Sequence, residues 1–295
     1  MLVGLQQCTY GAHGSDREIA ARLTGIAQGA EENGFSSFWL MDHLFQIGGW
    51  GPVTDPMLDV YTALGFVAAR TERIRLGPLV LSAVYRPPAV LVKAATTLDV
   101  LAGGRTYFGI GAAWFEREAR ALGLPFPARP ERYRVLEDVL RLARHMWSAD
   151  TSPFEGRTVT AAEPISEPRP LSSPRPRILV GGRGPRKTLG LVARYADAWN
   201  VIATPAEGAA RLQALRDRCA EVGRDPTGIE TTVLDPEDWR LDEDKDYRWS
   251  PEWELARLRK WKEIGFDHVI VNMPDAHEPA KLQAFGEVIA AVNAA

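Results

Sequence analysis

Short runs of apolar residues alternate with segments of helical periodicity along almost the whole chain. The runs are mostly continuous rather than alternately apolar and polar, which is typical of parallel strands covered on both faces. We expect strands at residues 2–7, 37–41, 74–81, 106–110, 178–181, 198–202, 229–234 and 268–272. Eight strand–helix units predict an α/β fold of the TIM-barrel type, a closed (β/α)8 barrel. A doubly wound open sheet remains the alternative, because the pattern does not show whether the sheet closes.

The segments between these strands carry helix signals. A Ser or Thr followed three residues later by Glu predicts a capping box, and Asp or Ser directly before proline predicts a helix start. Capping boxes stand at residues 15–18 and 204–207, and the proline signals at 55–56 and 250–251. Apolar stripes with helical spacing run through residues 19–30, 133–147 and 282–292, so each of these helices is expected to bury one face.

We expect one domain, residues 1–295, because the length suits a single barrel and no clean boundary interrupts the pattern. Two stretches are irregular. Residues 149–176 hold six prolines and follow the fourth strand–helix unit, so they form either a loose excursion or a lid over the active-site face. Residues 235–249 are rich in Asp and Glu, with Trp239 and Trp249 as possible anchors.

The composition mainly excludes certain kinds of partner, compartment and site. A formal net charge of −3 gives no basic footprint for nucleic acid. Cys8 and Cys219 are too few for a disulfide framework, no apolar run is long enough to span a membrane, and the first residues lack a signal-peptide pattern. We therefore expect a cytoplasmic protein. The histidines are scattered and no cysteines are paired, so no metal site is expected.

Candidate functional residues can be chosen because the active sites of barrel enzymes lie at the carboxyl ends of the strands. Asp42 and His43 follow the second strand, where His43 is either a proton-transfer group or a packed loop residue. Gly77-Pro78 within the third strand predicts a bulge, because proline removes a hydrogen-bond donor from the ladder.

Two glycine-rich segments follow later strands. The segment from Gly109 to Trp114 matches only part of GxGxxG, so it fails as a dinucleotide fingerprint, although its small residues allow a flat ring to approach. Residues 181–184, Gly-Gly-Arg-Gly, run straight into a helix. Exposed amides at a helix start, with Arg183 or Arg186 nearby, predict a phosphate site.

With these motifs in place, the chain resembles the luciferase-like family, and within it the bacterial F420-dependent oxidoreductases, over about residues 2–228. The segments that carry the resemblance are residues 39–43, 71–77, 97–105, 109–116, 178–182 and 193–200. Six segments in the right order at the right strand ends make the resemblance specific.

The resemblance implies a site. His43, with Asp42, would lie beside the deazaflavin ring as the catalytic pair, and a non-prolyl cis peptide bond between Leu79 and Val80 would support the ring. The implied cofactor-binding residues are Leu79, Val80, Ser82, Ala112, Ala113, Gly181, Gly182, Arg183, Gly184, Asn200 and Val201. The expected lining of the substrate pocket is Gln7, Trp50, Tyr85 and Trp114.

The resemblance also implies a reaction, the transfer of a hydride between coenzyme F420 and a small organic substrate. Trp114 stands where sugar-phosphate dehydrogenases of the family carry a catalytic Glu, so that substrate class is not expected. An FMN-dependent monooxygenase served by a separate reductase is the alternative, and a non-catalytic flavoprotein is a third. Family members are commonly dimers, so a homodimer is a further expectation.

Overall fold

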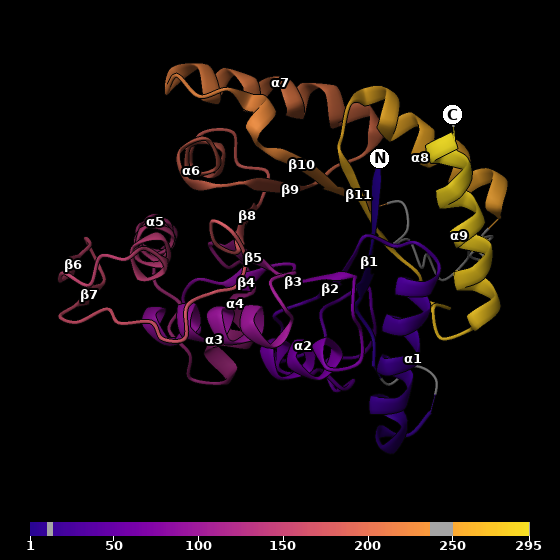
Figure 1. Ribbon diagram of the computed structural model, residues 1–295, viewed down its shortest axis with the longest axis horizontal. Helices are drawn as coiled ribbons and strands as arrows, with labels where there is room; N and C mark the ends of the chain where they lie inside the picture. Colours follow the sequence, from indigo (N-terminus) through magenta and orange to yellow (C-terminus); the bar gives the residue numbers. More distant parts are fainter. Residues whose placement is uncertain (11–13, 237–249, 295) are drawn as a thin grey trace.

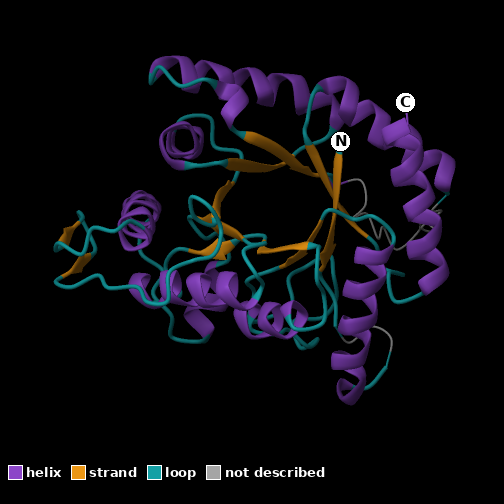
Figure 2. Ribbon diagram, in the orientation of Figure 1, coloured by secondary structure: helices purple, strands orange, loops and turns teal. Residues whose placement is uncertain are grey.

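A computed structural model describes residues 1–10, 14–236 and 250–294. Its main sheet curls into a nearly closed barrel ringed by helices (Figures 1 and 2). The strands, in sheet order, are β3 (Arg75–Pro78), β2 (Ser37–Leu40), β1 (Leu2–Gln7), β11 (His268–Asn272), β10 (Glu230–Leu234), β9 (Ala198–Ile202), β8 (Arg177–Gly181), β5 (Tyr107–Gly111) and β4 (Leu81–Ser82). Neighbouring strands pair in parallel, and a bridge between Leu76 and Thr106 brings the two ends of the sheet together. The predicted barrel is confirmed, and the open-sheet alternative is wrong.

The third expected strand is split in two. The break between β3 and β4 falls at Leu79 and Val80, whose peptide bond is cis as the resemblance implied. Every other expected strand is present with each end within one residue of its predicted position. The interruption follows Gly77-Pro78, where the sequence predicted a bulge.

The helices are α1 (Ile19–Glu32), α2 (Val60–Ala68), α3 (Pro88–Leu101), α4 (Glu116–Ala121), α5 (Arg129–Trp147), α6 (Lys187–Tyr195), α7 (Pro205–Glu221), α8 (Pro251–Ile264) and α9 (Pro279–Ala294), with short 3-10 turns η1 (Asp16–Glu18) and η2 (Pro226–Gly228). Both capping boxes form, and the Ser250 hydroxyl caps α8. The start predicted at residues 55–56 is wrong. Asp59 caps α2 instead, because its carboxylate accepts the Thr62 amide at 3.0 Å.

Side chains alternate between the barrel interior and the surrounding helices, as a pleated strand requires. Residues that point outward from the strands pack against buried helix stripes, including those predicted on α5 and α9. A smaller apolar cluster fills the interior, here called the lumen, and includes Trp39, Tyr107, Leu179 and Ile270. No described helix combines the length and the hydrophobicity needed to cross a bilayer.

A polar network closes the lumen at the amino ends of the strands; we call it the amino-end network. The Ser37 hydroxyl lies 2.9 Å from Nε2 of His268, whose Nδ1 lies 2.9 Å from the Glu230 carboxylate. The Tyr107 hydroxyl donates to Glu230 at 3.0 Å, and Arg177 forms an ion pair with it at 2.9 Å. Burial raises the pKa of Glu230, but the hydrogen bond and charge of His268, with Arg177, outweigh it and hold that pKa below its usual range.

The proline-rich insertion packs on the outside of the barrel. It contains a hairpin of β6 (Phe154–Glu155) and β7 (Thr160–Ala161), which lies beside α5 (Figure 1). Asp138 of α5 accepts the Thr158 amide at 2.6 Å, and Asp99 near the end of α3 accepts the Leu171 and Ser172 amides at 2.8 Å. The insertion is therefore neither a loose excursion nor a lid over the carboxyl ends of the strands. Residues 237–249, with Trp239 and Trp249, lie outside the described residues.

Candidate active site at the carboxyl ends of the strands

The carboxyl ends of the strands and the loops after them form what we call the mouth of the barrel. Here the glycines of the 109–111 segment and Gly181 make room for the bulge. A Cβ added to Gly109 would lie 2.1 Å from the Pro78 carbonyl oxygen. One added to Gly111 or Gly181 would lie 3.0 or 2.9 Å from the side chain of Val80. Val80 therefore sits over two glycines at the wall of the mouth, which explains the partial GxGxxG pattern without a dinucleotide.

His43 is held in place by a carboxylate that the sequence analysis missed. Its Nδ1 lies 3.4 Å from Glu118 of α4, and the same carboxylate accepts the Leu44 and Phe45 amides at 2.5 and 2.8 Å. Glu118 is fully buried. Burial raises the pKa of Glu118, but the hydrogen bonds from His43 and the two amides outweigh it and hold that pKa below its usual range. An ionised Glu118 favours a proton on Nδ1, which leaves Nε2 of His43 for a reactant.

Asp42 ties three elements together. Its carboxylate accepts two hydrogen bonds from Arg86, at 2.8 and 2.9 Å, and the Ser82 amide at 2.9 Å. Arg86 also pairs with Asp59 at 2.7 Å, at the start of α2. Burial raises the pKa of Asp42 above its usual range despite these contacts. The contacts favour a positioning role for Asp42 at the bulge, and its predicted catalytic role stays a prediction.

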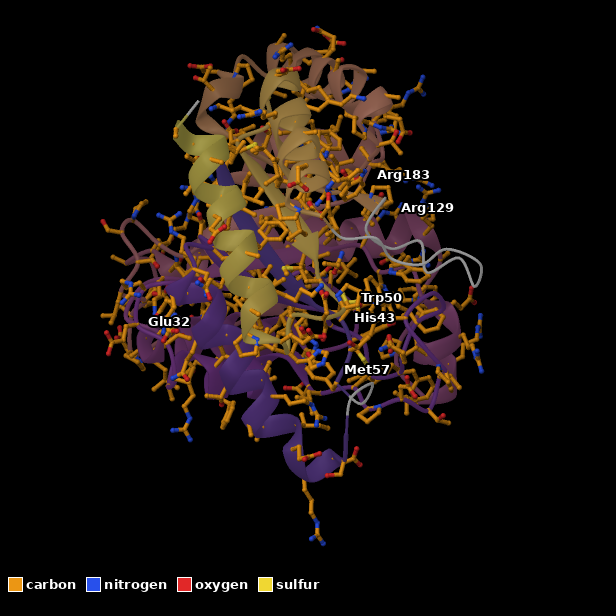
Figure 3. All side chains as sticks on the ribbon, turned by 90° about the vertical axis from the view of Figure 1, so that its right-hand side faces the viewer. Glu32, His43, Trp50, Met57, Arg129 and Arg183 are labelled. Carbon is orange, nitrogen blue, oxygen red and sulfur yellow. The ribbon has the colours of Figure 1, made fainter. Side chains whose placement is uncertain are left out.

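Aromatic side chains surround His43. Trp114 and Phe115 meet its ring edge-on, with centroids 5.5 and 5.7 Å away, and Trp114 is 63% exposed at the mouth. Trp50 is buried in an apolar cluster that Phe115 packs against, and lies close to His43 in Figure 3. The Tyr85 hydroxyl donates to the Phe115 carbonyl at 3.2 Å. Of the three aromatic residues predicted to line the pocket, Trp114 is thus the exposed one, while Trp50 and Tyr85 support the wall.

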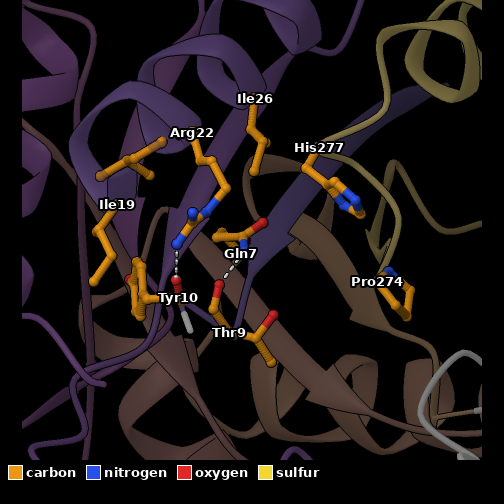
Figure 4. A pocket seen from close by; sticks show the side chains of 9 residues that line it. Gln7, Thr9, Tyr10, Ile19, Arg22, Ile26, Pro274 and His277 are labelled. Carbon is orange, nitrogen blue, oxygen red and sulfur yellow. Dashed lines mark hydrogen bonds between the residues drawn. The ribbon is translucent and has the colours of Figure 1, made fainter. Parts of the chain in front are cut away.

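Gln7 does not face the lumen. Its side-chain amide donates to the Thr9 carbonyl, and it lines a small pocket with Tyr10 and His277 between β1 and α1 (Figure 4). The neighbouring Gln6 points inward, where its amide donates to the Leu79 carbonyl at 3.3 Å. The sequence alone does not show which of two adjacent glutamines in a strand points to which face of the sheet. The role of Gln7 in the substrate pocket stays a prediction.

The glycine loop leads from β8 into α6. Gly182 has a φ of +129°, in the region that favours glycine. Its amide donates to the Asn200 carbonyl at 2.9 Å, so the loop is fixed to β9. Arg183 and Arg186 are exposed, and neither side chain has a hydrogen-bond or ion-pair partner among the described residues. Gly184 lies next to Thr188 in the first turn of α6.

The remaining predicted residues divide between the wall of the mouth and the outer core. The Asn200 amide donates to the Thr232 hydroxyl at 2.8 Å within the lumen. Val201 is buried in the outer core, so only its backbone is available to the mouth. Ile202, which the sequence analysis did not select, is 42% exposed at the end of β9. Its exposure depends on where β9 ends in the barrel, which the sequence pattern does not show.

Ala112 and Ala113 follow β5 and join this wall. The Ala112 carbonyl accepts from Arg132 of α5 at 3.0 Å, and Ala113 has a φ of +62°. Such a conformation is uncommon for a residue with a Cβ, and the small side chain lowers its cost. Leu79 packs inside the lumen, and the Ser82 amide holds Asp42. The structure thus brings most of the predicted residues to one end of the barrel, together with Glu118, Gln6 and Ile202.

Comparison with known proteins identifies relatives that share this architecture. The luciferase-like monooxygenase family matches residues 3–235. The F420-dependent glucose-6-phosphate dehydrogenase of Kineococcus radiotolerans is 31% identical over 267 residues, covering 88% of this chain and 74% of the relative. An F420-dependent secondary alcohol dehydrogenase, solved with an F420–acetone adduct, superposes with a TM-score of 0.79 at 20% identity, covering 99% of this chain and 98% of that one.

A solved monooxygenase shares the same fold. The oxygenating constituent of 3,6-diketocamphane monooxygenase from Pseudomonas putida, in complex with FMN, superposes with a TM-score of 0.77 at 16% identity, covering 99% of this chain and 98% of that one. The resemblance stated from the sequence motifs is therefore confirmed. The chain belongs to the luciferase-like monooxygenase family and is an oxidoreductase.

Proposed function

We propose that this protein is an F420-dependent oxidoreductase that transfers a hydride between the deazaflavin and a carbonyl or alcohol group of a small organic molecule. The observation that carries the proposal is the pair of His43 and buried Glu118 at the mouth, with Nδ1 of His43 directed at the carboxylate. Reduction of a carbonyl or oxidation of an alcohol needs a proton donor or acceptor in a fixed position, and an oriented histidine supplies one near neutral pH. The 31% identical F420-dependent relative supports the choice of cofactor.

The residues at the mouth fit a flat ring that carries a phosphate. Val80 over Gly111 and Gly181 forms an apolar wall, and Ile202 adds exposed apolar surface at the end of the neighbouring strand β9. Arg183, beside the start of α6, would offer a cation without an acidic partner to the phosphate. When bound, the deazaflavin would supply or accept the hydride at its C5 carbon.

The protein's own contribution would then be orientation, exclusion of water and proton transfer. Nε2 of His43 would donate its proton to the substrate oxygen during reduction and accept one during oxidation. Glu118 would fix the orientation of the ring, while Trp114 would cover the reacting atoms. Asp42 and Arg86 would hold the bulge that carries Val80, since the Ser82 amide is bound to Asp42.

An FMN-dependent monooxygenase is the second candidate. The FMN-bound fold relative supports it, and a glycine loop with an arginine suits a terminal phosphate equally well. The two candidates differ in what His43 would do, because oxygen activation at a flavin needs no proton donor aligned with a substrate carbonyl.

The proposal is tested by titrating the purified protein with F420 and, separately, with FMN, and following the fluorescence of each. We expect F420 to bind at least about tenfold more tightly, which corresponds to a difference of about 1.4 kcal/mol. Tighter binding of FMN would favour the monooxygenase. Turnover of F420 with a panel of ketones and secondary alcohols separates an enzyme from a protein that only binds the cofactor.

A further inference from the structure

The segment after β5, residues 112–115, brings two aromatic side chains to His43, and we call it the aromatic segment. Trp114 and Phe115 stack on each other with ring centroids 5.1 Å apart, and both meet the His43 ring edge-on. Just before them, Ala113 is the one residue other than glycine that has a positive φ in the described part of the chain. A residue with a Cβ keeps that conformation only where its surroundings enforce it. The place of Trp114 beside His43 therefore depends on contacts that hold the segment from outside.

Side chains from two other parts of the chain hold the aromatic segment at its ends. Nε of Arg132 in α5 donates to the Ala112 carbonyl at 3.0 Å. The Tyr85 hydroxyl, which follows β4, donates to the Phe115 carbonyl at 3.2 Å. Burial, together with the charge of Glu118, raises the pKa of Tyr85, so the hydroxyl keeps its proton for this bond. Both hydrogen bonds end on backbone carbonyls, so they fix where the aromatic side chains of the segment lie.

Arg132 joins the aromatic segment to the loop before α5. Its Nη1 donates to the Pro127 carbonyl at 2.8 Å, and its guanidinium lies 4.1 Å from the centroid of the Phe126 ring. It forms no ion pair with any residue that the structure describes, so carbonyl oxygens and this ring surround its charge. The cation stands near the start of α5, where the helix dipole disfavours positive charge. An arginine at this position is thus unfavourable for the helix itself, and its contacts favour a role at the aromatic segment.

We propose that Arg132 is a positioning residue for the reaction, which acts through Trp114 by holding the aromatic segment against His43. This inference rests on the proposed function, because its readout is turnover with F420. Trp114 would form a fixed wall beside the group that transfers the proton, and the substrate would be oriented between them. Without the hydrogen bond to Ala112 the segment would relax, and a small displacement of such a wall is enough to slow a reaction.

The test is a double-mutant cycle of Arg132→Met and Trp114→Ala, with kcat and KM measured at saturating F420 on a ketone or secondary alcohol that the native protein turns over. We expect each single variant to lower kcat/KM by about tenfold, within the range of coupling between residues that act together. The double variant should lie within about twofold of Trp114→Ala, because Arg132 then has no indole left to position. Independent effects would instead multiply to roughly a hundredfold loss. That result would overturn the role of Arg132 and leave the proposed function standing.

Thermal unfolding of the same preparations separates positioning from stability. A lower thermal midpoint of Arg132→Met with kcat/KM within about twofold of native would show that Arg132 only stabilises the fold, and would overturn the proposal. Arg132→Lys is the second variant, for use if Arg132→Met folds poorly. It keeps the charge beside Phe126 but offers no planar fork to the two carbonyls, so its loss of kcat/KM should depend on Trp114 in the same way.

Arg134→Met is the matched control, since Arg134 is an exposed arginine of the same helix that pairs with Glu131 at 2.6 Å. It should leave kcat/KM within about twofold of native. A loss as large as that of Arg132→Met would show that any arginine of α5 matters equally, and would overturn the proposal. A native protein that turns over no ketone or alcohol with F420 would overturn the proposed function and the role of Arg132 together.

Discussion

The two ends of the barrel are built from different chemistry. At the amino ends of the strands, Glu230, His268 and Tyr107 bind one another and close the lumen. At the mouth, Trp114 and Ile202 are exposed and Arg183 has no acidic partner among the described residues. Paired buried groups are expected to stabilise a fold, whereas exposed apolar groups and unpaired cations are features of ligand sites. The comparison predicts that substitutions at the mouth will mainly change activity and that substitutions at the amino ends will mainly change stability.

The largest effect on activity is expected at the mouth. His43→Ala should lower kcat with F420 by about 10²- to 10⁴-fold, because it removes the proposed proton-transfer group. Its thermal midpoint should stay close to that of the native protein, since His43 lies at the edge of the core. Steady-state kinetics and thermal unfolding on the same preparation check both parts. Activity within a few fold of native would show that His43 does not transfer the proton.

A glycine substitution tests whether the mouth depends on the bulge. Gly109→Ala should destabilise the protein by about 2–4 kcal/mol and abolish tight cofactor binding, because the new Cβ would lie 2.1 Å from the Pro78 carbonyl oxygen. Gly65→Ala in α2 is the control. No atom lies within 4 Å of its added Cβ, and it should stabilise the helix by roughly 0.5–1 kcal/mol. Denaturant unfolding measures both; similar stabilities would contradict the packing described for the bulge.

At the opposite end, Glu230→Gln should lower the free energy of unfolding by about 2–4 kcal/mol, because it leaves His268 and Arg177 without their carboxylate. Activity at low temperature should be nearly unchanged. The exposed Glu131→Gln, which breaks a surface pair with Arg134, is the control and should cost less than about 1 kcal/mol. If the Glu230→Gln protein were folded but had lost activity, stability and activity would not be separated between the two ends of the barrel.

The amino-end network also predicts a pH dependence. The pKa of Glu230 is lower in the folded protein than in the unfolded chain. Its stabilising contribution should therefore be complete above the unfolded value, about 4.3, and should disappear as the pH falls through the lower folded value. Denaturant unfolding at a series of acidic pH values should show a smaller decline for Glu230→Gln than for the native protein. Parallel declines would argue against the network as the acid-sensitive element.

A smaller effect is expected from the residue behind His43. Glu118→Gln should lower kcat by roughly 10- to 100-fold, the range found when a carboxylate that orients a histidine ligand of a metal is lost. Steady-state kinetics on the purified variant measures this loss. Glu116→Gln on the same helix is exposed and serves as the control. Full activity would leave Glu118 with a purely structural role.

The sequence by itself determined the barrel and the strand ends at which most candidate residues lie. Continuous apolar runs separated by helical stripes specify buried parallel strands, so the strand bounds could be predicted to within one residue, the bulge excepted. Capping residues fixed several helix starts, because they act within one turn. Motifs at the strand ends predicted His43 and the glycine loop, since the carboxyl ends of parallel strands must meet at one end of a barrel.

Only the tertiary structure decided which groups meet across that end. Glu118 is distant in sequence from His43 and reaches it because α4 folds back over the mouth. Gln6 rather than Gln7 faces the lumen because the register of β1 with its neighbours sets the phase of the strand. The insertion packs outside the barrel through Asp99 and Asp138. Such contacts depend on distances between separate elements, and local periodicity carries no information about them.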